Sequence, residues 1–530
     1  MSLLSRATRL LPLRPRRPRV RRYGHDPRPL RILLVAPRQP HSFWSLQGAV
    51  ELFGARTLMP NAALATLMAL TPDDVSVEYA LWDENVCPDR PSFTPDLVAV
   101  TGTTVHRRRI GELCRDFRGE GLPVALGGPC ASVDAELTHG LADHLFIGEA
   151  EHTWPQFLRD WRAGHPQPLY HQREPVDLAD TPPPDWSLID AEHYMVLSLQ
   201  TSRGCPHRCD FCDVVRYMGP GIRVKPVDQI MTEVKNAHAL GGRTVFFADD
   251  NFVGNRGHTR EVLAAVYAWN SVQERPLSFS TQLTVNVADD EELLHLLAET
   301  RLSVAFVGVE SVREESLREV HKSQNLRRDN RERLAQFSRH GIVPFLGLVV
   351  GFDHDDVDVF DEMYRFVEET NAPVVSLSVL NAPRGTPLYD RLAAEGRLLG
   401  DDFEGEWHGQ TNIIPKGMTR QELLERHQEL FRRLYDPRTF EPRLRRWLRS
   451  VEYFSPLYQN KRTDWRQLLG LAKLARFLAF DADAEVRRLF LRNIAWTLRH
   501  NPKLMRRTFS ILAHFRHYYE YARDLAPTSP

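Results

Sequence analysis

The sequence predicts an α/β protein with more than one domain and a helical C-terminal region. Short apolar runs rich in branched side chains alternate with helix-length segments from about residue 31 to residue 380. A proline-rich stretch at residues 181–186 interrupts this alternation, and beyond Met418 the pattern is helical. With 530 residues, the chain is long enough for two or three domains.

The composition is that of a soluble globular protein. Hydrophobic residues make up 42% of the chain and charged residues 26%, and the formal net charge of −1 gives no reason to expect a nucleic-acid partner. Three of the six cysteines are scattered at positions 87, 114 and 130, which is not a disulfide framework and suits a reducing cytoplasm. The sequence contains no run of about eighteen apolar residues, so we expect no transmembrane helix.

The first alternating region predicts a doubly wound parallel sheet. Its strands are expected at residues 32–36, 77–82, 97–100, 124–126 and 144–147. Such sheets bind ligands in the crevice beyond the carboxyl ends of the strands. Three predicted strands are followed there by glycines or hydroxyl residues, at 101–104, 127–129 and 148–151. The loop after the first strand carries His41, Phe43 and Trp44, which would either cover this crevice or pack beneath it.

Between the two alternating regions lies a loop with three closely spaced cysteines. Cys205, Cys209 and Cys212 have the spacing C-x3-C-x2-C, with Gly204 before the first and Phe211 before the last. Three thiolates on one loop can hold an iron–sulfur cluster, and a four-iron cluster would then keep one iron open. The alternatives are a zinc site that uses His207 as its fourth ligand, and structural thiols without a metal. The full pattern favours the cluster.

The second alternating region predicts six strands. One precedes Cys205, and the others are expected at residues 244–247, 278–285, 304–307, 343–350 and 374–380. Polar residues follow several of these strands, among them Asp249, Asp250, Asn251 and Glu310. They would serve either a ligand or the N-terminal caps of the helices that follow.

The cysteine loop resembles the signature of the radical SAM superfamily. The resemblance implies a central partial (β/α)6 barrel, a [4Fe-4S] cluster whose open iron binds S-adenosylmethionine, and one-electron cleavage of that molecule to a 5′-deoxyadenosyl radical. It also implies an electron donor such as a flavodoxin or ferredoxin. The S-adenosylmethionine contacts that it implies are Phe211, Asp249, Asp250, Asn251, Glu310, Gly347 and Gly351.

The N-terminal sheet, placed ahead of this loop, resembles the cobalamin-binding domain of B12-dependent radical SAM enzymes. The cobalamin contacts that this implies are Thr103, Gly127, Gly128, Gly148 and Glu149. The D-x-H-x-x-G motif that gives some B12 proteins a histidine ligand is absent, so we expect no cobalt ligand from such a motif. The alternative is a domain that binds no corrin and only shapes the substrate pocket.

Further motifs resemble a set of B12-type radical SAM enzymes that includes the hopanoid methylases. They lie at residues 246–255, 380–389, 395–399 and 411–412, and the resemblance covers about residues 30–440. It implies a cobalamin-dependent methyltransferase that acts on an unactivated carbon of a lipid, a terpenoid or a secondary metabolite. Two alternatives remain: a radical SAM rearrangement, cyclisation or oxidation without functional cobalamin, and an iron–sulfur electron-transfer or sensor protein.

These patterns divide the chain into five parts. A basic, disordered leader is expected at 1–28, or an over-extended start or Arg-rich targeting peptide in its place. The cobalamin-binding-like domain then spans 29–170, a proline-rich linker 171–195, the barrel 196–415 and a helical region 416–530. In that last region, helices are expected at 420–434 and 440–448, and the basic, aromatic stretch 487–522 would form a surface helix or contact an anionic membrane.

Overall fold

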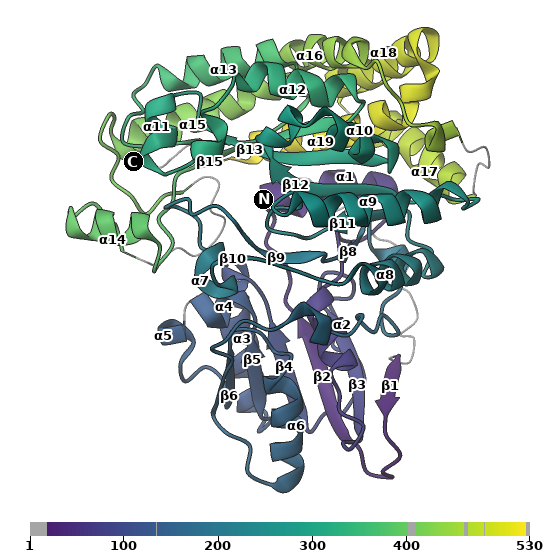
Figure 1. Ribbon diagram of the computed structural model, residues 1–530, viewed down its shortest axis with the longest axis vertical. Coiled ribbons are helices and arrows are strands. Elements are labelled where there is room, and N and C mark those ends of the chain that lie inside the picture. The colour runs from purple at the N-terminus through teal and green to yellow at the C-terminus, as the bar shows by residue number, and fades with distance from the viewer. Residues whose placement is uncertain (1–18, 134, 401–409, 460–464, 482, 526–530) are drawn as a thin grey trace.

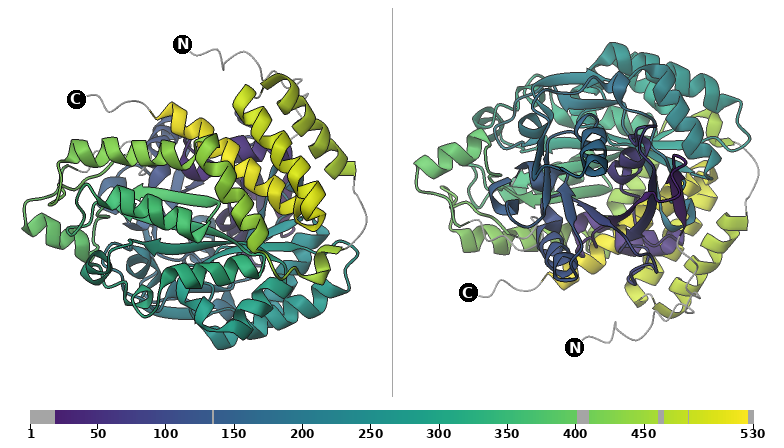
Figure 2. Two further views of the ribbon diagram at one scale, coloured as in Figure 1. Left: turned by 90° about the horizontal axis from the view of Figure 1, so that it is seen from above. Right: turned by 90° about the horizontal axis from the view of Figure 1, so that it is seen from below.

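A computed structural model describes residues 19–133, 135–400, 410–459, 465–481 and 483–525. The N-terminal sheet forms the lower half of the molecule in Figure 1, and the second sheet and its helices form the upper half. The C-terminal helices lie along the outside of the second sheet, on one side of it when seen from above (Figure 2). The α/β architecture with a helical C-terminal region is therefore as predicted.

The N-terminal sheet is doubly wound, because its two faces bury separate cores. Ile32 and Leu34 belong to one core, while the alternate residues Leu33 and Val35 belong to the other. The strand order is β1-β3-β2-β4-β5-β6-β7, and every pair except β1–β3 is parallel. The strands are β1 Val20–Tyr23, β2 Leu30–Ala36, β3 Val77–Asp83, β4 Leu97–Thr101, β5 Val124–Gly127, β6 His144–Ile147 and β7 Leu169–His171. The helices are α1 Gln47–Phe53, α2 Ala62–Ala69, α3 Arg107–Gly119, α4 Pro129–Val133, α5 Ala135–Thr138 and α6 Thr153–Ala163.

The edge strand β1 corrects the leader prediction for residues 20–23. These residues pair antiparallel with β3, and Arg21 Nε lies 3.0 Å from Asp185 Oδ2. Long-range pairing and an ion pair therefore order a stretch whose composition alone suggested disorder. Residues 1–18 of the predicted leader lie outside the described residues.

The second sheet has the six strands that the sequence predicted, all parallel and in the order β15-β14-β13-β12-β11-β8. Strands β8 and β15 are its two edges, so the barrel is open. The strands are β8 Leu197–Leu199, β11 Thr244–Phe247, β12 Ser278–Thr284, β13 Leu302–Glu310, β14 Val343–Val350 and β15 Val374–Val379. The helices are α8 Val227–Ala239, α9 Arg256–Ser271, α10 Glu291–Glu299, α11 Glu314–Glu319, α12 Asn330–Arg339, α13 Val359–Thr370 and α14 Pro387–Ala394.

The two faces of this sheet differ in burial. Along β12 and β13, alternate residues are buried beneath the helices, while the residues between them keep some accessible surface. The partly accessible set on β13 is Val304, Phe306 and Gly308. The inner face of the open barrel is therefore the face available to a ligand.

A two-stranded ribbon that the sequence did not reveal connects the two halves. Strand β9, Ser202–Cys205, pairs antiparallel with β10, Gly221–Val224, and the short helix α7, Val214–Met218, lies between them. The ribbon lies between the two sheets in Figure 1. The cysteine loop leaves β9, so it is placed at the junction of the two halves.

The C-terminal helices are α15 Arg420–Leu434, α16 Pro437–Ser450, α17 Trp465–Arg476, α18 Ala484–His500 and α19 Met505–Asp524. The first has the predicted bounds, and the second includes the predicted helix at 440–448. A π-helical turn, Phe477–Asp481, precedes α18. Short 3-10 helices connect the larger elements: η2 Phe43–Ser45, η3 Thr104–His106, η4 Leu178–Asp180, η5 Ala191–His193, η6 Val285–Asp289, η7 Ser323–Asn325, η8 Pro456–Gln459 and η10 Pro502–Leu504.

Helix α19 is an inner helix, so the predicted surface helix over 487–522 is wrong for that part. Tyr518 is fully buried, and its ring stacks on Phe43 at 4.3 Å between centroids. By contrast, α18 keeps Leu491 and Leu498 exposed by 52% and 58%, and its contact with a membrane stays a prediction. Within the described part of the chain, we find no helix long and apolar enough to cross a bilayer.

Candidate active site

The three cysteines of the loop are partly buried, and two of them face amide side chains. Asn251 Nδ2 lies 4.0 Å from Cys205 Sγ, and Gln324 Nε2 lies 3.8 Å from Cys209 Sγ. Burial raises the pKa of all three thiols, and that of Cys212 to about 12. Among the described residues, no three His, Cys, Asp or Glu side chains already surround one point as metal ligands.

Asp249 fixes the start of the cysteine loop. Its carboxylate accepts hydrogen bonds from the backbone N–H of Thr201 and of Ser202, both at 2.7 Å, and from the Thr201 hydroxyl at 2.6 Å. The side chain has no exposed surface, and this burial raises its pKa to about 6. Asp249 was predicted to contact S-adenosylmethionine, but its oxygens are occupied by the loop.

The two residues that follow Asp249 also accept backbone hydrogen bonds, Asp250 from the start of the cysteine loop and Asn251 from the end of β12. Asp250 Oδ2 accepts from the N–H of Gly204 at 2.8 Å, and Asn251 Oδ1 accepts from the N–H of Thr284 at 3.3 Å. The sequence reasoning placed all three residues correctly at the end of β11. It could not show that their polar atoms point back to the protein.

Gly204 is required by the backbone geometry of the ribbon. It has a φ of +87°, and a Cβ atom added there would lie 2.3 Å from the carbonyl oxygen of Gly221. Any other residue would therefore push β9 and β10 apart at the point where the cysteine loop begins.

Glu310 forms a buried ion pair with Lys322, a residue that sequence reasoning missed. Lys322 Nζ lies 2.7 Å from Glu310 Oε1, and the side chains are 10% and 12% exposed. Glu310 sits at an irregularity between β13 and β14 with a φ of +66°, which turns its side chain toward this lysine. The ring of Phe211 lies 6.0 Å from the ammonium group and 6.4 Å from the ring of Phe352. No spacing in the sequence indicates Lys322.

Gly347 and Gly351 were both predicted to contact S-adenosylmethionine, and a different feature of the backbone favours glycine at each of them. Gly347 pairs with Gly308 on β13, and a Cβ atom at Gly347 would lie 2.8 Å from Cζ of Phe306. Gly351 has a φ of +108°, and its N–H donates to Asp355 Oδ2 at 2.9 Å. Gly347 therefore lies on the strand next to that of Glu310, and Gly351 directly follows this strand.

At the carboxyl edge of the N-terminal sheet, the predicted glycines pack tightly against the chain. Added Cβ atoms would lie 2.3 Å from Thr101 Oγ1 at Gly128 and 2.5 Å from the Gln172 carbonyl oxygen at Gly148. Both glycines have positive φ, at +90° and +84°. Close packing within the domain therefore requires glycine at both positions.

Two further predicted contacts on this edge are Gly127 and Thr103. Gly127 is the last residue of β5, and a Cβ atom there would lie 3.2 Å from Cβ of Phe146. Thr103 is exposed, and its hydroxyl lies 3.0 Å from Nδ1 of His106, which sequence reasoning did not single out. The structure thus gathers the predicted glycines and Thr103 on one edge.

Glu149, predicted to contact cobalamin, connects the two halves of the molecule. Its carboxylate lies 2.5 Å from Arg203 Nη1 and 3.0 Å from Arg223 Nη1, both on the ribbon. Arg203 also pairs with Glu151 at 2.7 Å. Glu149 is only 9% exposed, so its charge is used within this cluster, which we call the interdomain clamp (Glu149, Glu151, Arg203 and Arg223).

The loop after β2 reaches the second sheet. Phe43 is fully buried there, while Trp44 remains 39% exposed. The ring of Trp44 lies 5.3 Å from Phe306 and 5.8 Å from Phe345, both on the second sheet. His41 is exposed, 5.9 Å from the ring of His517. Of the two expected roles, packing is correct for Phe43, and Trp44 borders the accessible inner face.

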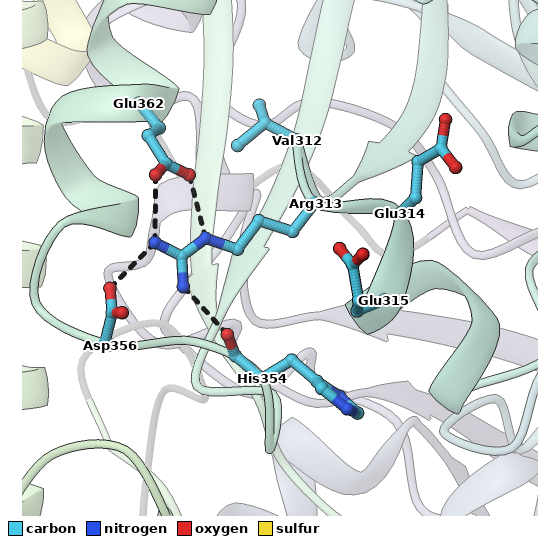
Figure 3. Close-up of a pocket in the computed structure, with 7 residues that line it drawn as sticks. All are labelled: Val312, Arg313, Glu314, Glu315, His354, Asp356 and Glu362. Atoms are coloured by element: carbon cyan, nitrogen blue, oxygen red, sulfur yellow. Dashed lines mark hydrogen bonds and ion pairs between the residues drawn. The ribbon is translucent and has the colours of Figure 1, made fainter.

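A separate polar depression lies next to α11, and Figure 3 shows its lining. Arg313 is held there by Glu362 at 2.8 Å, by Asp356 at 2.7 Å and by the carbonyl oxygen of His354 at 2.8 Å. Because these three acceptors already engage the guanidinium of Arg313, the depression does not present it to an anionic ligand.

The sequence matches two protein families. Residues 199–367 match the radical SAM superfamily, and residues 386–528 match a domain of unknown function, DUF4070. An uncharacterized methyltransferase of Synechocystis sp. is 31% identical over 500 residues, which cover 93% of this chain and 92% of that protein. The hopanoid C-2 methylase of Rhodopseudomonas palustris is 32% identical over 380 residues, or 70% and 72% of the two chains.

Solved structures share the fold. The cobalamin-dependent S-adenosylmethionine radical enzyme OxsB, with aqua-cobalamin and S-adenosylmethionine bound, gives a TM-score of 0.59 at 15% identity and covers 94% of this chain and 80% of its own. The radical S-adenosylmethionine methyltransferase TsrM from Kitasatospora setae, with cobalamin and a [4Fe-4S] cluster bound, gives 0.57 at 16% identity and covers 94% and 100%.

Proposed function

The chain belongs to the radical SAM family that includes the hopanoid C-2 methylase, and we propose that it is a cobalamin-dependent methyltransferase acting on an unactivated carbon. Membership in this family implies a [4Fe-4S] cluster and S-adenosylmethionine. In such enzymes the cluster supplies one-electron cleavage of S-adenosylmethionine, and cobalamin supplies the methyl group. The observation that carries the proposal is the position of the cysteine loop, at the junction of an open parallel sheet and a doubly wound sheet.

Cys205, Cys209 and Cys212 would hold the cluster. Three sulfur donors within eight residues suit iron, and the amide groups of Asn251 and Gln324 face two of these sulfurs. The donor set therefore fits the group. A one-electron donor such as a flavodoxin or ferredoxin remains a prediction.

S-adenosylmethionine would bind on the inner face of the sheet beside the cysteine loop. Glu310 ends β13, while Gly347 lies on the neighbouring strand β14 and Gly351 directly follows that strand. The ring of Phe211, on the cysteine loop, lies 6.0 Å from the ammonium group of Lys322. Asp250 and Asn251 border the same loop. We assign Asp249 to positioning the loop, because the protein occupies its carboxylate.

Cobalamin would lie at the carboxyl edge of the N-terminal sheet. Thr103 is exposed there, and Gly127, Gly128 and Gly148 lie at the carboxyl ends of β5 and β6, where doubly wound sheets bind their ligands. Glu149 would act beside this site through the interdomain clamp rather than as a direct contact.

The substrate would be apolar where it meets the inner face, which supports the lipid and terpenoid classes. Phe306 is two residues before Gly308 on β13, so both side-chain positions share one face, with Trp44 against them. Aromatic rings stabilise a hydrocarbon body by burial and offer little to a charged group.

The cluster assignment is tested by replacing one cysteine. After anaerobic reconstitution, C209A should lose iron and sulfide and should release no 5′-deoxyadenosine from S-adenosylmethionine, because one of three ligands is gone. The control is C87A, which removes an exposed cysteine outside the loop and should keep both. A C209A protein that keeps its cluster and its cleavage activity would contradict the assignment.

The cobalamin assignment is tested on protein purified anaerobically with cobalamin supplied. Stoichiometric corrin in the protein, together with methyl label from S-adenosylmethionine in a triterpene or other lipid product, supports the methyltransferase. Iron and sulfide without corrin would instead favour a rearrangement, cyclisation or oxidation, and the N-terminal domain would then be a pocket wall.

A further inference from the structure

A segment far along the chain packs directly against the cysteine loop. The backbone N–H of Asp210 donates to the carbonyl oxygen of Val320 at 3.2 Å. Gln324 Nε2 faces Cys209 Sγ at 3.8 Å, although the two residues are 115 positions apart. We call residues 320–325 the facing segment. Its position is therefore fixed relative to the loop, and a charge within it has a defined effect there.

Lys322 supplies such a charge. It lies in the middle of the facing segment, its side chain is 10% exposed, and its ammonium group forms an ion pair with Glu310 at 2.7 Å. The space for its ammonium is limited, since a Cβ atom at Gly308 would lie 3.1 Å from Nζ. Removing a cation from water is costly, and the ion pair with Glu310 offsets part of that cost.

The ammonium group lies beside the cysteine loop, 6.0 Å from the centroid of the Phe211 ring. Burial raises the pKa of Cys205, Cys209 and Cys212, and Lys322 is among the charges that lower it at each of the three. Glu310 is among the charges that act on Cys209. The charge of the ammonium group therefore favours the negatively charged form of each of the three sulfurs.

We propose that the ammonium group of Lys322 raises the reduction potential of the cluster that the three cysteines would hold, with Glu310 keeping the lysine in place and partly offsetting its charge. The inference rests on the proposed function. Adding an electron makes a cluster more negative, so a nearby cation stabilises the reduced state. In a partly buried site this attraction is screened less than in water.

The test is the midpoint potential of the reconstituted protein, measured by a redox titration followed by electron paramagnetic resonance without S-adenosylmethionine. K322M should shift the potential in the negative direction, because the cation is lost and Glu310 remains. E310Q should shift it in the positive direction, because the cation remains without its counter-charge. The double variant should return toward the wild-type value, and K322R should stay near it.

The matched control is Lys225, whose ammonium forms an even more buried pair with Glu233 at 2.5 Å, outside the loop and the facing segment. K225M removes the same kind of ion pair and should leave the potential unchanged. An unchanged potential in both K322M and E310Q, or a shift of both in one direction, would overturn the proposal. So would an unchanged potential combined with weaker S-adenosylmethionine binding, which would make Lys322 a ligand contact.

Two outcomes separate this proposal from the proposed function. If K322M binds no cluster, E310Q still decides, because it keeps the ammonium group. If the wild-type protein itself binds no cluster, the proposed function fails and not the assignment of Lys322 alone.

Discussion

The carboxylate of Asp249 accepts three hydrogen bonds from the two residues that open the cysteine loop. Two of the donors are backbone N–H groups, which cannot reach water in this buried place. At the scale of single residues, the site thus depends on acceptors that hold the loop as much as on groups that touch a ligand.

D249A should therefore reduce cluster binding and stability. It leaves two buried N–H groups without an acceptor, at about 1–3 kcal/mol each. D249N keeps an acceptor oxygen and should retain most of both. Iron content and thermal unfolding measure the difference. A D249N protein that folds and binds its cluster but loses S-adenosylmethionine would show that the charge of Asp249 serves the ligand after all.

Gly204 and Gly221 have nearly the same backbone conformation, so substituting each by alanine should cause the same backbone strain. Their φ values are +87° and +86°, but a Cβ atom would collide at Gly204 and meets nothing within 4 Å at Gly221. G204A and G221A should share a cost of about 1–2 kcal/mol for the left-handed backbone. G204A should be less stable still and should bind less iron. Urea unfolding gives the free energy of unfolding of each variant. If both variants lose the same free energy and the same amount of iron, the ribbon accommodates the added Cβ atom at Gly204.

At the scale of elements, the ribbon β9–β10 is joined to the N-terminal sheet by the interdomain clamp. Arg203 is 13% exposed and pairs with both Glu149 and Glu151. The clamp thus connects the carboxyl edge of one sheet to the start of the cysteine loop. This position gives Glu149, just after β6, a structural role in joining the two halves.

E149Q should destabilise the cobalamin-free protein by about 1–3 kcal/mol, because two arginines each lose one charged partner in a largely buried place. E112Q is the control: Glu112 pairs with arginines on the surface of α3, where such pairs contribute about 0–1 kcal/mol. Thermal unfolding without cobalamin measures both. Normal stability with weakened cobalamin binding in E149Q would instead identify Glu149 as a corrin contact.

At the scale of the whole molecule, a short segment of the N-terminal half belongs to the core of the other half. Phe43 is fully buried between Tyr518 of α19 and Phe431 of α15. His517 Nε2 lies 3.0 Å from the carbonyl oxygen of Phe43. The N-terminal loop, the barrel and the last helix therefore fold as one unit.

F43A should cost about 3–5 kcal/mol, the usual range for emptying a buried aromatic site. F53A is the control, because Phe53 is 40% exposed on the neighbouring helix α1 and should cost much less. Urea unfolding followed by both circular dichroism and tryptophan fluorescence gives the free energies. Equal effects of the two substitutions would mean that the loop after β2 contributes little to the joined core.

The sequence by itself determined five strands of the N-terminal sheet, the six strands of the second sheet and the cysteine loop between them, but not the edge strands β1 and β7. Alternation of apolar runs and the spacing of three cysteines are local properties, and local geometry follows from them. The bounds of α15 and the six strands of the open barrel show how far this reasoning reaches.

Only the tertiary structure decided which charges meet. Lys322 reaches Glu310, and Glu149 reaches Arg203 across the two halves, because separate loops cross at the junction of the sheets. The buried position of α19 was likewise hidden, since its basic and aromatic composition resembles that of a surface helix. Which face of such a helix is covered depends on distant partners, and neither spacing nor periodicity encodes them.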